Sequence, residues 1–184
     1  YGFDPNKKLV FVTGGSQGAR SVNEAVYENL HFFEEHDIQL LWQCGSLYFK
    51  EYSSRLGYQV NDHIQLVKFV ENMDHAYASA DIVVARAGAG TISELCVVGK
   101  PAILIPSPNV AEDHQTKNAL ALAEKEAAIM IPDNRIDEQL LPGAIRLINH
   151  PEECEKVSEN IKTLAKPDAT RQIVNEAEKL LING

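Results

Sequence analysis

The sequence has little positive charge and no long hydrophobic run, and each shortage excludes a class of protein. Of 184 residues, 17 are lysine or arginine and 26 are aspartate or glutamate, which gives a formal net charge of −9. This balance argues against non-specific nucleic-acid binding and against a polybasic membrane patch, because both require positive charge to meet phosphate or anionic lipid. The longest apolar runs, such as 102–105, are far shorter than the roughly 20 residues that span a bilayer.

Cysteines are few, and a leader is lacking. Cys44, Cys96 and Cys154 are far apart, and no Cys-x-x-Cys or Cys/His spacing suits a metal, so we expect free, buried thiols in a reducing cytosol. The chain starts at Tyr1 with neither an initiator methionine nor an apolar leader, so we expect one domain, residues 1–184, cut from a longer protein. Its 45% hydrophobic and 23% charged residues are typical of a folded domain.

Short apolar segments alternate with amphipathic ones along the chain, which is typical of a parallel α/β sheet covered on both faces. The predicted strands are 8–13, 38–44, 63–69, 81–85, 102–105 and 127–131. The predicted helices are 17–35, 46–56, 73–79, 91–98, 112–125, 137–149, 152–164 and 169–181. We therefore predict a doubly wound, mostly parallel, six-stranded Rossmann-like sheet of order 3-2-1-4-5-6, with a ligand beyond the strand ends where the order reverses.

A first glycine-rich segment, 13–19 (TGGSQGA), follows the first strand and precedes a helix. Glycines let an anion approach the backbone, and the helix N-terminus offers unpaired N–H groups and a positive dipole. The segment is either a phosphate-binding loop or a tight turn without a ligand. It lacks the Gly-x-Gly-x-x-Gly spacing of dinucleotide-binding proteins and an acid after the second strand, and no P-loop Gly-Lys-Ser/Thr follows. A dehydrogenase is therefore not favoured.

A second glycine-rich segment, 86–91 (RAGAGT), follows the fourth strand and should lie beside the first, so that two helix N-termini face one cleft. Arg86 is either a phosphate counter-charge or a surface cation at the strand end. Glu94 has two interpretations. Thr91 and Glu94 fit a capping box, with Thr91 as the N-cap. Alternatively, the Glu94 carboxylate accepts hydrogen bonds from ribose hydroxyls.

A third polar segment, 106–118, follows the fifth strand and enters a helix beside the second glycine-rich segment. The amides of Gln115 and Asn118 both donate and accept, which suits sugar hydroxyls. Alternatively, Asp113 caps the helix and the amides are solvated. His114 lies in the same place, and no partner at a clear spacing makes it part of a nucleophile–base pair.

Three stretches in order resemble the carboxyl-terminal domain of the MurG family of bacterial peptidoglycan glycosyltransferases. They are FVTGGSQGARSVNEAV, FVENMDHAYASADIVVARAGAGTISEL and GKPAILIPSPNVAEDHQTKNA, and the resemblance runs from Gly2 to the last helix. It implies half of a GT-B enzyme, an inverting hexosyltransferase that moves N-acetylglucosamine from UDP-N-acetylglucosamine to lipid I, giving lipid II. It implies no cofactor besides this donor substrate and no nucleic-acid partner.

The resemblance also implies roles for individual residues around the donor. The implied diphosphate and sugar contacts are Gly15, Ser16, Gln17, Ala89, Gly90 and Thr91. The backbone of Phe69 and Val70 would contact uracil, and Glu94 the ribose. The implied contacts to the N-acetylglucosamine hydroxyls are Gln115, Asn118 and His114. Gly90 departs from the pattern, because some relatives carry a larger residue there, which puts any side-chain role at that position in doubt.

The resemblance places the catalytic base, the lipid I site and the membrane-contacting patch in an amino-terminal domain that this chain does not include. It therefore implies that this half alone is inactive, and that the full-length protein is cytoplasmic and peripheral on the inner membrane face. The last helix would pack toward the other domain, or else it is an ordinary core helix. No Asp-x-Asp motif is present, so no protein-held metal is predicted. The alternatives are another UDP-sugar GT-B enzyme, a subunit of a split N-acetylglucosaminyltransferase, and a non-catalytic nucleotide-binding module.

Overall fold

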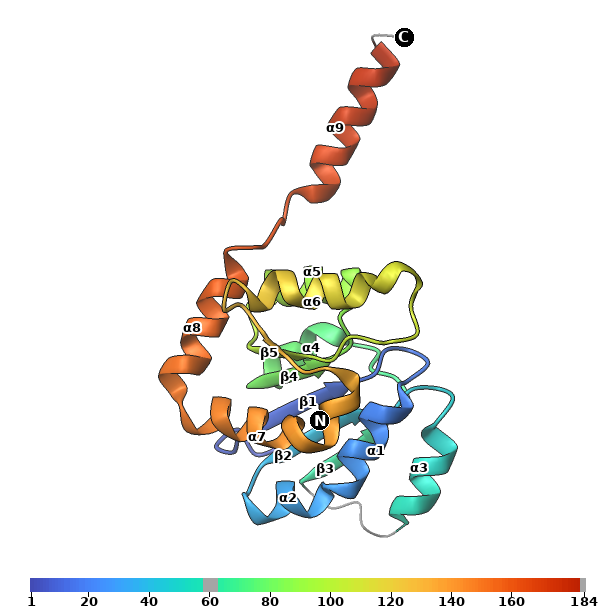
Figure 1. Ribbon diagram of the computed structural model, residues 1–184, viewed down its shortest axis with the longest axis vertical. Coiled ribbons are helices and arrows are strands. Elements are labelled where there is room, and N and C mark those ends of the chain that lie inside the picture. The colour runs from blue at the N-terminus through green and yellow to red at the C-terminus, as the bar shows by residue number, and fades with distance from the viewer. Residues whose placement is uncertain (58–62, 183–184) are drawn as a thin grey trace.

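Six parallel strands form a single sheet in the order β3-β2-β1-β4-β5-β6, which confirms the predicted topology. The computed structural model in Figure 1 describes residues 1–57 and 63–182. The strands are β1 (Leu9–Thr13), β2 (Gln39–Gln43), β3 (Ile64–Val67), β4 (Ile82–Ala85), β5 (Ala102–Leu104) and β6 (Ile129–Met130). The central strands β1, β2, β4 and β5 are buried along their whole length, as expected for a sheet with both faces covered.

Helices cover both faces of this sheet because successive strand side chains point to opposite sides. Val12 packs into the core beneath one set: α1 (Arg20–Glu28), α2 (Leu30–Glu35), α3 (Phe49–Leu56) and α7 (Ile136–Asn149). Phe11 packs into the core beneath the other: α4 (Met73–Ser79), α5 (Ala89–Val98) and α6 (His114–Ala123). Helix α8 (Pro151–Lys162) contributes Val157 to the first core and Ile161 to the second, so it ties the two layers together.

Several helices begin or end elsewhere than predicted. The predicted helix 17–35 is two helices that meet at Asn29, where the backbone leaves the helical region and the side-chain amide donates to the Ala25 carbonyl. Its first three predicted residues belong to the preceding loop. Helix α5 starts at Ala89, two residues before its predicted start, and α6 starts at His114 after a short 3-10 turn, η1 (Ala111–Asp113). A second 3-10 turn, η2 (Asp133–Arg135), leads into α7.

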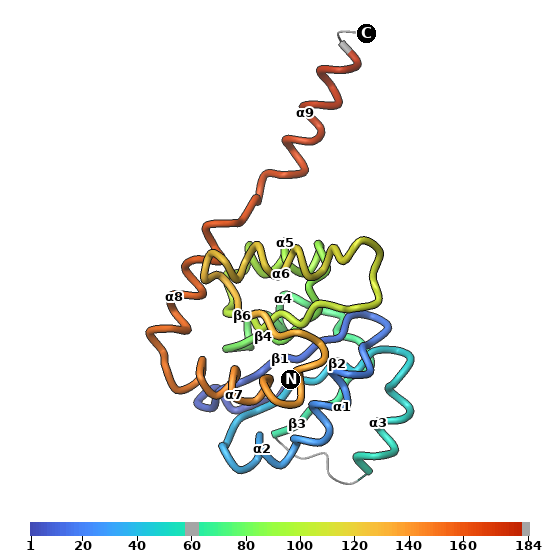
Figure 2. The backbone as a smooth tube through the Cα atoms, viewed as in Figure 1, coloured from blue at the N-terminus to red at the C-terminus, as the bar shows by residue number. Residues whose placement is uncertain are grey.

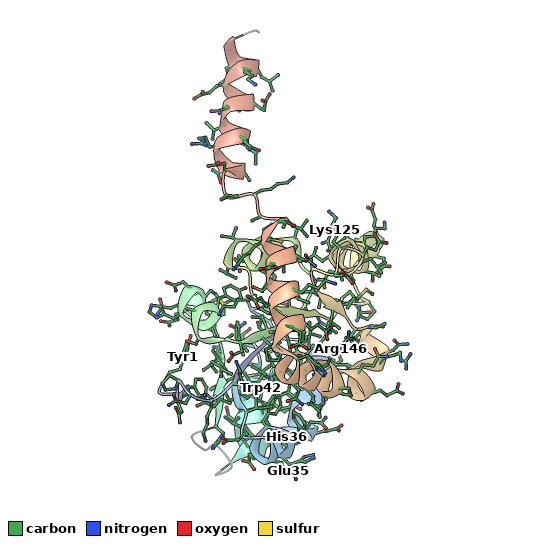
Figure 3. All side chains as sticks on the ribbon, turned by 90° about the vertical axis from the view of Figure 1, so that its left-hand side faces the viewer. Tyr1, Glu35, His36, Trp42, Lys125 and Arg146 are labelled. Carbon is green, nitrogen blue, oxygen red and sulfur yellow. The ribbon has the colours of Figure 1, made fainter. Side chains whose placement is uncertain are left out.

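The last helix, α9 (Ala169–Ile182), stands apart from the rest of the chain in the two perpendicular views of Figures 1 and 3. Its large apolar side chains are exposed, from 48% for Val174 to 83% for Leu181. The interpretation of this segment as an ordinary core helix is therefore wrong. Among the described residues, nothing covers the apolar face of α9 that includes Ile173 and Leu180, and exposed apolar patches of this kind mark interaction surfaces.

A buried amide links α1 to the end of β2. The Asn23 side chain is fully buried; its Oδ1 accepts from the Trp42 indole N–H at 2.9 Å, and its Nδ2 donates to the Cys44 carbonyl at 2.9 Å. Trp42 lies in the interior of the molecule (Figure 3). Both partners are cut off from water, so this one side chain satisfies two groups that would otherwise be buried without a hydrogen bond.

We expect Asn23→Ala to lower the free energy of unfolding by about 1–3 kcal/mol, because it strands the Trp42 N–H and the Cys44 carbonyl. Urea unfolding followed by tryptophan fluorescence measures this directly. Asn149→Ala, at the exposed end of α7, is the control and should change stability by no more than about 0.5 kcal/mol. Equal stability of the two variants would contradict the role given to Asn23.

Candidate functional site

An open cleft of about 720 Å³ lies at the carboxyl ends of the strands, where the order reverses between β1 and β4. The β1–α1 loop, the β4–α5 loop and the polar segment after β5 line it together. Of the residues predicted to bind ligand, it contains Gly15, Arg86, Thr91 and Gln115 in its lining. Sheet topology therefore brings together three segments that are far apart in the sequence.

Two helix N-termini meet at this cleft. Gly18–Ser21 at the start of α1 and Gly88 and Thr91 at the start of α5 are among its lining. Within the described residues, no side chain caps either helix, and neither has an acidic residue in its first turn. The first backbone N–H groups of each helix have no partner inside the helix. The cleft consequently offers two sets of N–H donors and two positive dipole ends, an arrangement that suits an anion with two phosphates.

The β1–α1 loop needs its glycines to reach this position. Gly15 and Gly18 adopt φ values of 88° and 90°, which strongly favour glycine. A Cβ at Gly18 would collide with the Cys44 carbonyl oxygen, since the loop packs directly on the start of the β2–α3 connection. The Ser46 and Leu47 amides donate to the carbonyls of Ser16 and Gln17, at 3.0 and 3.3 Å. The tube in Figure 2 shows the course of the two connections that these bonds join, from β1 to α1 and from β2 to α3. The side chains of Ser16 and Gln17 are exposed at the rim.

Sequence reasoning missed two residues that support this loop. Gly45 has φ 88° and contacts the Gly18 backbone so closely that any side chain would clash. Gln43 is 3% exposed; its Nε2 donates to Thr13 Oγ1 at 2.9 Å and to the Gly15 carbonyl at 3.1 Å, and its Oε1 accepts from the Val70 N–H at 2.7 Å. In the sequence, the feature that could have indicated a role for Gln43 is its polar amide at the end of an apolar strand. It joins the first glycine-rich loop to the segment after β3.

Phe69 and Val70 lie outside the main cleft, in a separate hollow of about 420 Å³ beside α4. The Phe69 side chain is 54% exposed and Val70 is buried. The Val70 N–H already donates to Gln43 Oε1. A nucleotide base in this hollow would therefore have to hydrogen-bond to other backbone N–H or C=O groups of the segment after β3. The two hollows have no lining residue in common: α4 contributes to the smaller one and the start of α5 to the main cleft.

The capping-box interpretation of Glu94 is wrong. Gly88 is the N-cap of α5, so Thr91 lies in the first turn and Glu94 in the second, too far along the helix to reach the N-cap amide. Instead the exposed Glu94 carboxylate accepts a hydrogen bond from the Tyr77 hydroxyl of α4 at 2.9 Å. Ala89 and Gly90 are the exposed first residues of the helix, and a Cβ at Gly90 would meet open space. The fold therefore has room for a larger side chain at this position.

Arg86 takes a role that neither interpretation included. Its guanidinium donates to Asp133 Oδ1 at 2.5 Å, to the Ser21 hydroxyl at 2.9 Å, and to two carbonyls at the end of β5 at 3.2 Å. The Ser21 hydroxyl donates in turn to Asp133 at 2.7 Å. The Arg86 and Asp133 side chains are only 14% and 21% exposed. Arg86 therefore clamps α1, β4, β5 and η2 together at the cleft wall, with its charge compensated by Asp133.

Side-chain amides of the polar segment after β5 hydrogen-bond to backbone groups and hold this segment in place. Gln115 Oε1 accepts from the Ser107 N–H at 2.9 Å, and Asn118 Nδ2 donates to the Ala87 carbonyl at 3.2 Å, which joins α6 to the second glycine-rich loop. Exposed His114 Nδ1 lies 2.8 Å from the Ala111 carbonyl. Asp113 is the N-cap residue, as the alternative interpretation required, but its carboxylate accepts from the Thr116 hydroxyl at 2.6 Å and caps no backbone N–H.

Metal and membrane features are limited in the part of the chain that the structure describes. There, no group of three or more His, Cys, Asp or Glu side chains is arranged to hold a metal ion. None of the described helices is both long and apolar enough to cross a bilayer. Cys44, Cys96 and Cys154 are free thiols, the first two buried, and burial raises the pKa of Cys44 to about 11.

Almost the whole chain matches known proteins. The chain is 44% identical over 98% of its length to the UDP-N-acetylglucosamine–N-acetylmuramyl-(pentapeptide) pyrophosphoryl-undecaprenol N-acetylglucosamine transferase of Parabacteroides distasonis, and covers 49% of that protein. The enzyme of the same name from Christiangramia forsetii is 47% identical over 97% of the chain, which covers 48% of it. The chain thus spans about half the length of the curated relatives it matches.

Solved structures give the same picture. The crystal structure of Acinetobacter baumannii MurG matches with a TM-score of 0.82 and 28% identity, over 95% of this chain and 50% of that one. The S. aureus MnaA–UDP structure matches with a TM-score of 0.73 over 96% of this chain and 47% of that one, and at 16% identity it supports the fold alone. The model of the glycosyltransferase family 28 C-terminal domain matches residues 9–173. This chain therefore belongs to the glycosyltransferase family 28 C-terminal domain family.

Proposed function

We propose that this chain is the donor-binding half of the N-acetylglucosaminyltransferase that converts lipid I to lipid II in peptidoglycan synthesis. The observation that carries the proposal is the pair of uncapped helix N-termini at one cleft, in a chain of the glycosyltransferase family 28 C-terminal domain family. The names of the relatives from Parabacteroides distasonis and Christiangramia forsetii supply the donor, UDP-N-acetylglucosamine, and the undecaprenyl-linked acceptor.

In this proposal the donor runs across the sheet edge from the hollow beside α4 to the polar segment after β5. Uracil lies at Phe69 and Val70, the ribose at Glu94, and the diphosphate between the starts of α1 and α5. The sugar faces the start of α6, within reach of Gln115, Asn118 and His114. This order rests on the linings of the two hollows, since α4 contributes to the smaller one and the starts of α1, α5 and α6 to the main cleft.

The proposed reaction is an inverting displacement at the anomeric carbon. The bond between that carbon and the diphosphate oxygen breaks while the deprotonated acceptor hydroxyl forms the new one, and UDP leaves with the electron pair. Negative charge therefore grows on the leaving diphosphate, where the first-turn amides of α1 and α5 are aimed. We assign charge stabilisation to these helix N-termini, because the sequence has no Asp-x-Asp motif to hold a metal.

The remaining parts of the reaction belong, in this proposal, to an amino-terminal half of the same protein. That half would supply the general base, the lipid I site and contact with the inner face of the cell membrane. Helix α9 supports this division, because its large apolar side chains are exposed and lack a partner among the described residues of this chain. We propose that this apolar face packs against the other half.

We expect the chain to bind UDP and UDP-N-acetylglucosamine, and Glu94→Ala to weaken UDP binding by about 1–3 kcal/mol, because ribose hydroxyls lose a charged acceptor. Isothermal titration calorimetry measures the dissociation constants. Glu35→Ala, an exposed carboxylate at the end of α2, is the matched control and should bind as the wild type does. Equal or tighter binding of NAD than of UDP by the wild-type chain would overturn the proposal.

We expect this 184-residue chain alone to transfer no N-acetylglucosamine to a lipid I analogue, since it would lack the acceptor site and the base. The assay follows radiolabelled sugar from UDP-N-acetylglucosamine into the lipid product. The full-length Parabacteroides distasonis enzyme serves as the positive control. Turnover by the chain alone would show that the division of labour proposed here is wrong.

We expect Arg86→Met to lower the free energy of unfolding by about 1–3 kcal/mol, because Asp133 and Ser21 lose a largely buried partner. Asp133→Asn should destabilise the chain in the same direction, and urea unfolding of the double variant should show less than the summed loss. If Arg86 were instead a phosphate counter-charge, Asp133→Asn would tighten UDP binding while Arg86→Met weakened it without loss of stability.

A further inference from the structure

Glu94 connects the helices that line the two hollows, since it belongs to α5 and accepts a hydrogen bond from Tyr77 of α4. It follows Thr91, which lines the main cleft, by three residues along α5, so the two side chains share a face of the helix. Its hydrogen-bond partner Tyr77 belongs to α4, the helix that follows the Phe69–Val70 hollow. A ribose joining a base in one hollow to a diphosphate in the other would pass this carboxylate.

The Tyr77 side chain lies in the hydrophobic core. It is 3% exposed, and its ring packs edge-to-face on Phe11 of β1, with ring centroids 6.0 Å apart and planes at 72°. Burial, and then the hydrogen bond to Glu94, raise the pKa of the Tyr77 hydroxyl, so this group remains a protonated donor at neutral pH. The position of the donor is thus set by the sheet itself, through Phe11.

The fixed Tyr77 hydroxyl restricts the conformation of the exposed Glu94 side chain, which would otherwise be flexible. A free glutamate samples several rotamers, and a ligand that needs one of them must restrict the others. The Tyr77 hydroxyl holds Glu94 Oε2 at 2.9 Å and uses one of about four acceptor positions of the carboxylate. The other positions remain for two further donors.

We propose that Tyr77 is a positioning residue that presents the Glu94 carboxylate to the 2′ and 3′ hydroxyls of the donor ribose. This inference rests on the proposed function, because it requires that the ligand be a ribonucleotide held by Glu94. Tyr77 itself touches no ligand. Its effect is to hold the carboxylate in the conformation that a ribose diol needs before the nucleotide arrives.

The test compares the affinities of Tyr77→Phe and the wild-type chain for UDP and for 2′-deoxy-UDP by titration calorimetry. Wild type should prefer UDP. Tyr77→Phe should weaken UDP binding about two- to tenfold, the value of one hydrogen bond, and should weaken 2′-deoxy-UDP binding less, because only the 3′ hydroxyl still meets the carboxylate, so that the preference shrinks. The substitution keeps the ring and its contact with Phe11, and thermal unfolding checks that the fold is retained.

Two controls make the effect specific. Tyr27→Phe removes a hydroxyl that contacts the Arg55 carbonyl at 3.4 Å, away from both hollows, and should leave both affinities unchanged. In a Glu94→Ala background, Tyr77→Phe should cause no further loss of UDP affinity, because the carboxylate that it positions is gone.

The outcomes separate this inference from the proposed function. No binding of UDP by the wild-type chain would overturn both. UDP binding with a preference for ribose that Tyr77→Phe leaves intact would overturn the positioning role alone. Equal weakening of UDP and 2′-deoxy-UDP in Tyr77→Phe would also overturn it, because a general packing effect of Tyr77 between α4 and α5 does not depend on the 2′ hydroxyl.

Discussion

The adjacency of β1 and β4 is the constraint on which the rest of the site depends. All strands are parallel, so their carboxyl ends share one edge of the sheet, and the helices that follow β1 and β4 pass to opposite faces. Helices α1 and α5 therefore begin side by side and then diverge, which opens a cleft between their first turns. Amides that neither helix can pair internally are directed to the same place. Without this strand order the two glycine-rich loops would not line the same cleft.

A site made from backbone amides needs a fixed backbone, and buried polar side chains supply this here. Gln43 joins the first glycine-rich loop to the segment after β3, and Asn23 holds the end of β2 against α1. The Arg86–Asp133 pair fixes the opposite wall of the cleft. Each of these groups is hydrogen-bonded where water is largely excluded, so displacing a loop would leave several unpaired polar atoms at once. Their common effect is to keep the cleft open and in one shape.

The surface at the carboxyl edge fits a domain that works with a second one. Leu47 is 68% exposed and Phe69 54%, and both lie in loops that follow adjacent strands at this edge. Helix α9 adds a further apolar face that extends away from the sheet (Figure 1). Because the chain spans about half the length of its relatives, these apolar surfaces and the open cleft have the same explanation in the proposed function, namely contact with the other half of the enzyme.

The sequence by itself determined the sheet, its strand order and the two glycine-rich loops, because short buried strands alternating with amphipathic helices leave few other topologies. It could not determine what Arg86 and Glu94 contact. Their partners, Asp133 and Tyr77, lie 47 and 17 residues away in the chain, and only the packing of η2 and α4 brings them within hydrogen-bond distance. The start of α5 was also decided in three dimensions: Thr91 and Glu94 match a local capping pattern, yet the helix extends to Ala89. Sequence spacing predicts contacts only between residues that are close along the chain. The partners of Arg86 and Glu94 are set by tertiary packing, so their roles could be assigned only from the folded structure.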